Sequence, residues 1–418
     1  MVPIEPIADL GARAKAASRV LATASTEVKD AALLAAADLL LDRHAEILAG
    51  NADDVAAAEA AGTASPVIDR LRLTDARLQS MAAGLRKVAA LSDPVGEVAD
   101  GWTRPNGLRV QRVRVPLGVV AIIYENRPNV TSDAFGLCLK AGNAAFLRGS
   151  SAAIRSNIAI ASALREGLAK AGLPEDSLVL VEDTSYDAAV EFMRLRESID
   201  VLIPRGGPSL IRSILDNATV PYVIDGDGNC HVYVDASADL GAAADIVENA
   251  KVQRPSVCNA AETLLVHRNV AANFLTDVAP RLEGVELVGD EATQEILGDR
   301  VAAIATDVDY ATEFLDLKLA VRVVDTLEAA IAHIRRYGSG HSEAIVTNDL
   351  RAAEHFTREV DAAAVLVNAS TRFVDGEELG FGAEIGISTQ KLHARGPMGL
   401  RELTTLKFVI HGDGHIRA

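Results

Sequence analysis

Residues 117–147 read LGVVAIIYENRPNVTSDAFGLCLKAGNAAFL, and this stretch decides the fold class. The apolar segment 119–124 predicts a buried strand, 132–140 predicts a helix, and 144–147 predicts a second strand. Because both strands are apolar on both faces and a helix joins them, the pattern predicts a parallel sheet covered by helices. In such a sheet, ligands are expected at the carboxyl ends of the strands.

The same alternation of strand and helix continues along the chain. Further strands are expected at 178–181, 200–203 and 220–224, and a second series at 263–266, 320–324, 344–346 and 364–367. The first hundred residues are rich in alanine and predict helices. We therefore predict an α/β protein with a parallel-sheet cofactor domain, an α/β catalytic domain and a small β flap. The expected boundaries are a cofactor-binding domain at 1–228, a catalytic domain at 229–370 and a return segment at 371–418.

The flap is predicted from an alternating segment. Residues 108–115 read LRVQRVRV, with period two, and the turn residues Pro105-Asn106-Gly107 precede them. A hairpin is therefore expected near 104–116. A strand at 404–410 is expected to return to the first domain or to this flap. Because such a flap often docks on another subunit, we expect a homo-oligomer.

The composition excludes several classes of protein. The chain has 418 residues, of which 49% are hydrophobic and 24% charged, and its 41 basic residues face 58 acidic ones, for a net charge of −17. A general binder of nucleic acid or anionic membrane carries a basic excess instead. The three cysteines, Cys138, Cys230 and Cys258, are too few for a disulfide framework. We expect a soluble cytoplasmic enzyme with no nucleic-acid or membrane partner.

Two strand-to-helix loops are candidates for binding phosphate. One is Arg148-Gly149-Ser150, and the other runs from Arg205 through Gly206 and Gly207 to Pro208. Glycine lets the backbone approach a phosphate, and a helix N-terminus supplies oriented N–H donors. Each loop also fits an ordinary βα turn.

Cys258 is the candidate nucleophile among the cysteines. It lies in the segment QRPSVCN between a predicted helix and strand, and Lys251 and Arg254 are close in sequence. Cationic neighbours lower a thiol pKa and favour the thiolate. Cys138 lies in an apolar helix and is expected in the core. Cys230, which precedes a histidine, fits a metal site or the core, and we expect no metal because zinc spacing is absent.

Asn126 ends the first strand of the sheet, where chemistry is expected. Its side chain could donate an N–H to an oxyanion. It could equally cap the turn before Pro128.

Several motifs resemble a known family. The segment VPLGVV at 115–120 is similar to the start of the cofactor domain in the aldehyde dehydrogenase superfamily. Four longer motifs are similar to the γ-glutamyl phosphate reductases of that superfamily: YENRPNVTSDA at 124–134, KAGNAAFLRG at 140–149, QRPSVCN at 253–259 and STQKLHARGPMGL at 388–400. The resemblance covers essentially the whole chain and implies the aldehyde dehydrogenase-like fold.

The resemblance also implies roles for residues. Cys258 matches the nucleophile, and Asn126 with the Cys258 backbone N–H matches the oxyanion hole. Arg148, beside Gly149 and Ser150, falls where the superfamily contacts the adenosine ribose, and a cation there is compatible with the 2′-phosphate of NADP(H). Gly206 and Gly207 fall at the pyrophosphate turn. Glu313 falls near the nicotinamide ribose, although Leu315-Asp316-Leu317 stands where Gly-Pro is usual.

The implied reaction is NADPH-dependent reduction of L-glutamyl 5-phosphate to L-glutamate 5-semialdehyde, the second step of proline biosynthesis, with glutamate 5-kinase as a candidate partner. Oxidising members of the superfamily carry a glutamate that activates water, whereas Asp225 stands near that place here. An acyl-phosphate reductase does not need that base. The alternatives are an oxidising NAD(P)-dependent aldehyde dehydrogenase and a non-catalytic scaffold.

The substrate carries phosphate and carboxylate, yet the chain is acidic, so local cations must attract it. The candidates flank the matching motifs, and each could equally be a solvated surface charge. They are Lys251, Arg254, Arg372 and Arg395.

Overall fold

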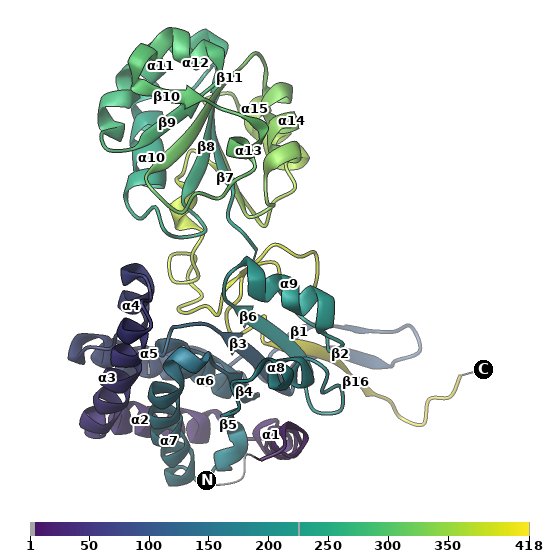
Figure 1. Ribbon diagram of the computed structural model, residues 1–418. Helices are drawn as coiled ribbons and strands as arrows, with labels where there is room; N and C mark the ends of the chain where they lie inside the picture. Colours follow the sequence, from purple (N-terminus) through teal and green to yellow (C-terminus); the bar gives the residue numbers. More distant parts are fainter. Residues whose placement is uncertain (1–4, 225, 418) are drawn as a thin grey trace. The chain divides into compact units, whose positions relative to one another are not determined.

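The computed structural model describes residues 5–224 and 226–417 (Figure 1). These residues form two compact units. The first unit contains residues up to 224, together with 381–386 and the residues from 398 onward. The second unit contains the described residues of 225–380 and 387–397. Residues 371–380 and 387–397, expected in the return segment to the first domain, thus pack with the second unit.

Alanine-rich helices begin the first unit, as the composition predicts. They are α1 (Ile7–Leu21), α2 (Thr26–Asp42), α3 (His44–Ala60), α4 (Ser65–Leu71) and α5 (Asp75–Ala90). Two of them start at hydroxyl caps: the Ser25 side chain accepts from the Val28 N–H, and Thr74 accepts from the Arg77 N–H. Such caps satisfy N–H groups that have no partner within the helix.

The sheet of the first unit has the strand order β5-β4-β3-β6, and every neighbouring pair is parallel. The strands are β3 (Val119–Tyr124), β4 (Ala144–Arg148), β5 (Leu178–Leu180) and β6 (Val201–Arg205). The connecting helices are α6 (Asn129–Lys140), α7 (Ile154–Lys170) and α8 (Tyr186–Phe192), and α9 (Pro208–Asn217) follows β6. Helices α6 and α7 pack with α2 and α5, whereas α1 packs against the strands and α8 (Figure 1). The predicted parallel sheet is confirmed.

The strand expected at 220–224 is wrong. The structure has only an isolated bridge between Leu202 and Tyr222 there. Pro221 accepts a hydrogen bond from the Leu202 N–H at 2.8 Å. Because proline has no N–H to donate, the segment cannot extend a ladder.

The expected hairpin and returning strand are both present. Strands β1 (Val98–Thr103), β2 (Arg109–Pro116) and β16 (Thr404–His411) form an antiparallel sheet in the order β1-β2-β16. Trp102 and Phe408 pack edge to face across it, with ring centroids 6.4 Å apart. The C-terminal strand thus joins the hairpin of the first unit.

The second unit is built on a sheet of seven described strands in the order β10-β9-β11-β8-β7-β12-β13, all parallel. The strands are β7 (Cys230–Val234), β8 (Ala261–His267), β9 (Glu286–Gly289), β10 (Val301–Ile304), β11 (Lys318–Val324), β12 (Ser342–Val346) and β13 (Ala364–Val367). A separate short ladder joins β14 (Ile387–Ser388) and β15 (Gly396–Pro397). The sequence pattern missed the short strands β9 and β10, which are polar or exposed at several positions.

Helices cover both faces of this sheet. They are α10 (Leu240–Val252), α11 (Arg268–Val278), α12 (Glu291–Leu297), α13 (Asp307–Tyr310), α14 (Leu327–Tyr337) and α15 (Leu350–Glu359). Alternate residues of a strand pack on opposite sides: Leu264 joins the cluster of α10 and α11, and Leu265 joins that of α14 and α15. Within residues 5–224 and 226–417, no helix is long and apolar enough to cross a membrane.

Candidate functional site

Polar groups follow the carboxyl ends of the strands in the first unit. Asn126 comes directly after β3 and has a φ of 42°, a conformation that asparagine tolerates better than most residues. Its backbone N–H donates to Ser150 Oγ at 3.3 Å, and Ser150 Oγ donates to Asn126 Oδ1 at 3.0 Å. This reciprocal pair holds the side chain by its oxygen. The Asn126 amide nitrogen, which is the donor that an oxyanion needs, lies outside the pair.

Arg148 is the last residue of β4 and lies at the same carboxyl edge of the sheet. Its Nη2 donates to the backbone carbonyls of Thr184, at 2.9 Å, and Ser185, at 2.8 Å. Burial lowers the pKa of Arg148, and the nearby Asp183 carboxylate opposes that effect. The buried Nε has no hydrogen-bond partner among the described residues. A ligand oxygen could supply the missing acceptor, so this residue fits a bound nucleotide.

Gly149 shows why this turn has no side chain. A Cβ at Gly149 would lie 2.2 Å from Asn157 Nδ2, so any other residue would have to displace Asn157. Asn157 is itself fixed, because its Oδ1 accepts from Thr131 Oγ1 at 3.1 Å. The predicted cofactor loop therefore has a close-packed base.

The second glycine loop precedes α9, with Pro208 at the start of the helix. The Gly207 N–H donates to Glu125 Oε2 at 3.0 Å, and a Cβ at Gly206 would meet the same oxygen at 2.7 Å. The Glu125 carboxylate thus accepts a hydrogen bond from a backbone N–H that was expected to face a pyrophosphate. The sequence analysis missed Glu125, although its place between Tyr124 and Asn126 put it at the carboxyl edge.

In the second unit, Cys258 lies in the loop between α10 and β8. Its backbone oxygen accepts a hydrogen bond from Cys230 Sγ at 3.2 Å. A Cβ at Gly228 would lie 1.6 Å from the same oxygen, so only glycine lets these two segments approach. Cys138 and Cys230 are buried, and burial raises the pKa of both thiols, whereas Cys258 is half-buried. Cys258 is therefore the cysteine that a substrate can reach.

Arg372 spans the loop that carries Cys258. Its Nε donates to Gln253 Oε1 at 2.8 Å, and its Nη1 donates to Asn259 Oδ1. Burial lowers the pKa of Arg372, the cation Arg254 lowers it further, and the nearby side chains of Asp375 and Cys258 oppose both effects. The structure thus brings Cys258, Arg254 and Arg372 into one electrostatic neighbourhood.

A pocket of about 260 Å³ lies beside Arg372. Its lining combines this cation with two amide side chains, three carboxylates and one aromatic ring: Asn249, Gln253, Asp375, Glu377, Glu378 and Phe373. A ligand with both a carboxylate and an ammonium group would find partners for both charges here.

The other two predicted cations have partners of their own. Lys251 is fully buried, and its Nζ lies 2.6 Å from Glu262 Oε2. Arg395 donates to Asp361 at 2.8 Å, and Lys391 pairs with the same carboxylate. Both cations are thus paired with carboxylates of the chain, whereas a cation that contacts substrate usually has a donor left for it.

Glu313 precedes β11, and its Oε1 accepts the Gly228 N–H at 2.8 Å. This contact ties Glu313 to the turn that lies against Cys258. Asp225, the residue near the expected place of a water-activating base, lies outside the described residues.

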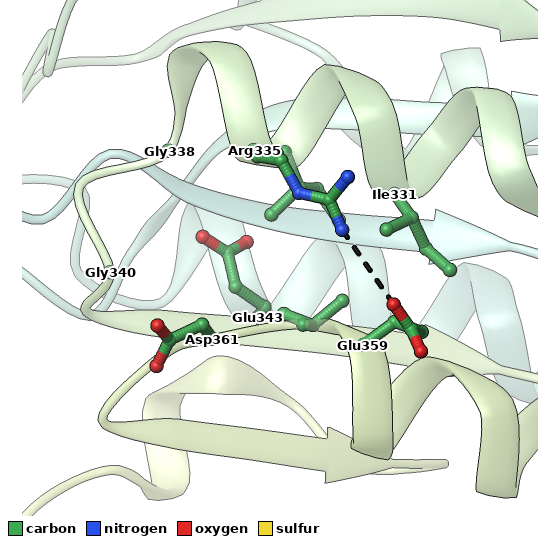
Figure 2. Close-up of a pocket in the computed structure, with 9 residues that line it drawn as sticks. Ile331, Arg335, Gly338, Gly340, Glu343, Glu359 and Asp361 are labelled. Atoms are coloured by element: carbon green, nitrogen blue, oxygen red, sulfur yellow. Dashed lines mark ion pairs between the residues drawn. The ribbon is translucent and has the colours of Figure 1, made fainter.

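A second pocket in this unit holds none of the predicted site residues in its described lining. Figure 2 shows it between the end of α14, the start of β12 and the end of α15, with the Arg335–Glu359 ion pair (3.7 Å separation) on one wall. Its volume is about 190 Å³. The buried Glu343 carboxylate accepts from His231 Nδ1 at 2.9 Å.

Comparison with known proteins identifies the class to which this fold and site belong. The model of the aldehyde dehydrogenase family matches residues 6–303, so the chain belongs to that family. The relatives include two gamma-glutamyl phosphate reductases. The one from Moorella thermoacetica is 57% identical and covers 97% of each chain, and the one from Clostridium beijerinckii is 56% identical and covers 97% of this chain and 98% of its own.

A solved structure agrees with these relatives. The crystal structure of gamma-glutamyl phosphate reductase from Thermotoga maritima has a TM-score of 0.97 and 49% identity, and covers 99% of this chain and all of the other. Within the aldehyde dehydrogenase family, the chain thus belongs to the γ-glutamyl phosphate reductases. The predicted family and the predicted fold class are both confirmed.

Proposed function

We propose that this enzyme reduces L-glutamyl 5-phosphate to L-glutamate 5-semialdehyde with NADPH and releases phosphate, as the second step of proline biosynthesis from glutamate. The observation that carries the proposal is the half-buried Cys258 thiol, which lies near Arg254 and Arg372. Cations favour a thiolate and attract an anionic acyl phosphate. The relatives, which are named gamma-glutamyl phosphate reductase, support the same substrate.

The chain's own groups account for the acyl-transfer half of the reaction. The Cys258 thiolate attacks the acyl carbon, and the Asn126 amide and the Cys258 backbone N–H donate to the oxyanion that forms. The oxyanion collapses, the bond to phosphate breaks, and a thioester on Cys258 remains. NADPH, when bound, supplies the hydride that reduces the acyl group.

Enzymes of the aldehyde dehydrogenase family use nicotinamide cofactors, and NADP(H) is the form that we propose. Arg148 Nε is a buried donor that lacks an acceptor in the described residues, and a 2′-phosphate would supply one. Gly149 and Ser150 form the adjoining turn, and Gly206, Gly207 and Glu313 are the remaining proposed cofactor contacts.

The substrate's amino-acid end is proposed to bind beside Arg372. The carboxylate would pair with Arg372, and the ammonium group with the acidic residues of the 260 Å³ pocket. Arg254 is exposed and remains a proposed phosphate contact, as does Arg395 once it leaves Asp361.

The larger organisation stays a proposal as well. We propose a cofactor-binding role for the domain at 1–228, a catalytic role for 229–370, and oligomerisation through the flap and the return segment at 371–418. A cytoplasmic location and an association with glutamate 5-kinase complete the proposal.

The reverse reaction tests the proposed activity. Purified enzyme receives glutamate semialdehyde and NADP⁺, with and without phosphate, while absorbance at the NADPH band and released glutamate are both followed. We expect NADPH formation that needs phosphate or arsenate, with little glutamate in their absence. Rapid phosphate-independent glutamate formation would instead assign the chain to the oxidising aldehyde dehydrogenases, and no cofactor reduction under any condition would indicate a scaffold.

A further inference from the structure

The carboxylate of Glu262 joins both ends of the loop that carries the nucleophile. Glu262 lies in β8, just after Cys258, and Lys251 lies in the last turn of α10, just before it. Their Nζ and Oε2 atoms are 2.6 Å apart, and both side chains are fully buried. The ion pair therefore closes the base of the loop formed by residues 253–260.

The second oxygen of Glu262 reaches another part of the site. Its Oε1 accepts the Leu315 N–H at 3.2 Å, and Leu315 has a φ of 53°. Leucine disfavours this left-handed conformation, so the surroundings must hold it in place. The same segment carries Glu313, whose carboxylate accepts the Gly228 N–H beside Cys258. Glu262 thus links the two ends of the Cys258 loop to the segment that carries Glu313 and Leu315.

Stability alone does not account for this pair. Burial raises the pKa of Glu262 to about 7 and lowers the pKa of Lys251, which means that removing these groups from water opposes their charges. Replacing a buried ion pair by well-packed neutral residues is often neutral or stabilising. The charged pair instead fixes the relative positions of two segments, because one carboxylate binds Lys251 and Leu315 at the same time.

We propose that Glu262 and Lys251 are positioning residues for the Cys258 loop and the Glu313 segment. Lys251 acts through Glu262 and does not contact substrate, in place of the substrate contact predicted from its position in the sequence. The inference rests on the proposed function, because it takes Cys258 to be the nucleophile.

The decisive variant is Lys251→Met/Glu262→Gln, which removes both charges and leaves no buried charge unpaired. In the semialdehyde, NADP⁺ and phosphate assay, we expect kcat to fall about 10- to 100-fold, because small displacements of a reacting group have effects of that size. The KM for semialdehyde should stay within about threefold, because the substrate loses no contact. Lys251→Arg, which keeps the ion pair, should keep kcat within about threefold of the wild-type value.

A matched control separates positioning from stability. Lys29 of α2 and Asp93, in the segment that follows α5, form another ion pair of the first unit, with 2.5 Å between Nζ and Oδ2 and with Lys29 fully buried. Lys29→Met/Asp93→Asn should change the unfolding midpoint while leaving kcat near the wild-type value. An equal fall in kcat for both double variants would overturn the proposal, because the effect would then be general destabilisation.

Two other outcomes would also overturn it. Wild-type kcat in a folded Lys251→Met/Glu262→Gln enzyme would show that the pair positions nothing, and a raised KM with unchanged kcat would restore Lys251 as a substrate contact. If the double variant does not fold, Glu262→Asp replaces it, because the shorter carboxylate keeps its charge but cannot reach both partners, and the same fall in kcat is expected. A fully active Cys258→Ala enzyme would instead refute the proposed function itself.

Discussion

The two parallel sheets of this enzyme present their proposed functional residues at opposite edges. In the first unit, Asn126, Arg148 and Gly206 lie at or just beyond the carboxyl ends of β3, β4 and β6. In the second unit, Cys258 and Glu313 precede the amino ends of β8 and β11. Both sheets are parallel and are covered by helices. Their two kinds of edge differ in the backbone groups that they present to a ligand.

The chemistry of the two edges explains this division. A loop at a carboxyl edge leads into a helix N-terminus, where N–H donors favour phosphate. A loop at an amino edge follows a helix C-terminus, where carbonyl oxygens predominate and repel anions. A nucleophile at the amino edge of the second unit would therefore need cationic side chains nearby, and Arg254 and Arg372 are the proposed ones.

The largest effect on turnover is expected from Cys258→Ala. If the amino edge of the second unit holds the nucleophile, turnover should be abolished, because no thioester can form. The first unit should still bind NADP(H), since the substitution leaves its carboxyl edge unchanged. Steady-state kinetics and cofactor titration would measure the two effects separately.

Cys138→Ala is the matched control, because Cys138 is fully buried within α6. This change should lower the unfolding midpoint and spare the chemistry of the folded enzyme. Equal loss of turnover at both cysteines would contradict the assignment of Cys258.

Asn126→Ala tests the carboxyl edge of the first unit. We expect kcat to fall by roughly 10²- to 10³-fold, the usual consequence of losing one oxyanion-hole donor. The change also removes the acceptor of the Ser150 hydroxyl, so Ser150→Ala serves as a control for the lost pair. An effect confined to KM would make Asn126 a binding or turn residue.

Sequence reasoning found much of the first unit because its signals are local. A wholly apolar strand such as 119–124, followed by a polar residue such as Asn126, predicts both the sheet and its ligand edge. The amino edge of the second unit has no comparable rule. Cys258 was predicted from its neighbours and from the family resemblance, whereas its packing against Gly228 is visible only in three dimensions.

The fate of Lys251 illustrates the same limit. In the sequence it is a cation close to the proposed nucleophile, but in the fold it is buried against Glu262. The available signal was a glutamate inside the apolar strand at 261–267, because a buried charge there requires a partner. The partner itself could not be chosen from the sequence, since tertiary packing determines it.

Gly228→Ala tests the close packing at the amino edge. The added Cβ would overlap the Cys258 carbonyl oxygen, so the loop or the turn must move. A displacement of about 1 Å can cost about 10²-fold in rate, and we expect a fall in kcat of about that size. Gly84→Ala in α5 is the control, because a Cβ there meets nothing within 4 Å and should leave kcat unchanged. Comparable kcat values for the two variants would show that the Cys258 backbone tolerates movement.

The smallest effect is expected from Arg148→Ala, in the proposed cofactor loop of the first unit. One terminal nitrogen of Arg148 already donates to the Thr184 and Ser185 carbonyl oxygens, so only part of its guanidinium remains for a ligand. If that part binds the 2′-phosphate, the lost charge-assisted hydrogen bond should raise the Kd for NADPH about 10-fold. NADH lacks the phosphate, and its Kd should change much less.

Fluorescence titration of both cofactors measures the ratio directly. Arg196→Ala is a suitable control, because Arg196 also donates to a backbone carbonyl, that of Thr219, but precedes the amino end of β6. It should alter neither Kd. An equal rise for NADPH and NADH in Arg148→Ala would assign the residue to the shared ribose or to the carbonyl contacts. The carboxyl edge would then hold the nucleotide through features common to both cofactors, and the preference for NADP(H) would have to come from other residues of the chain.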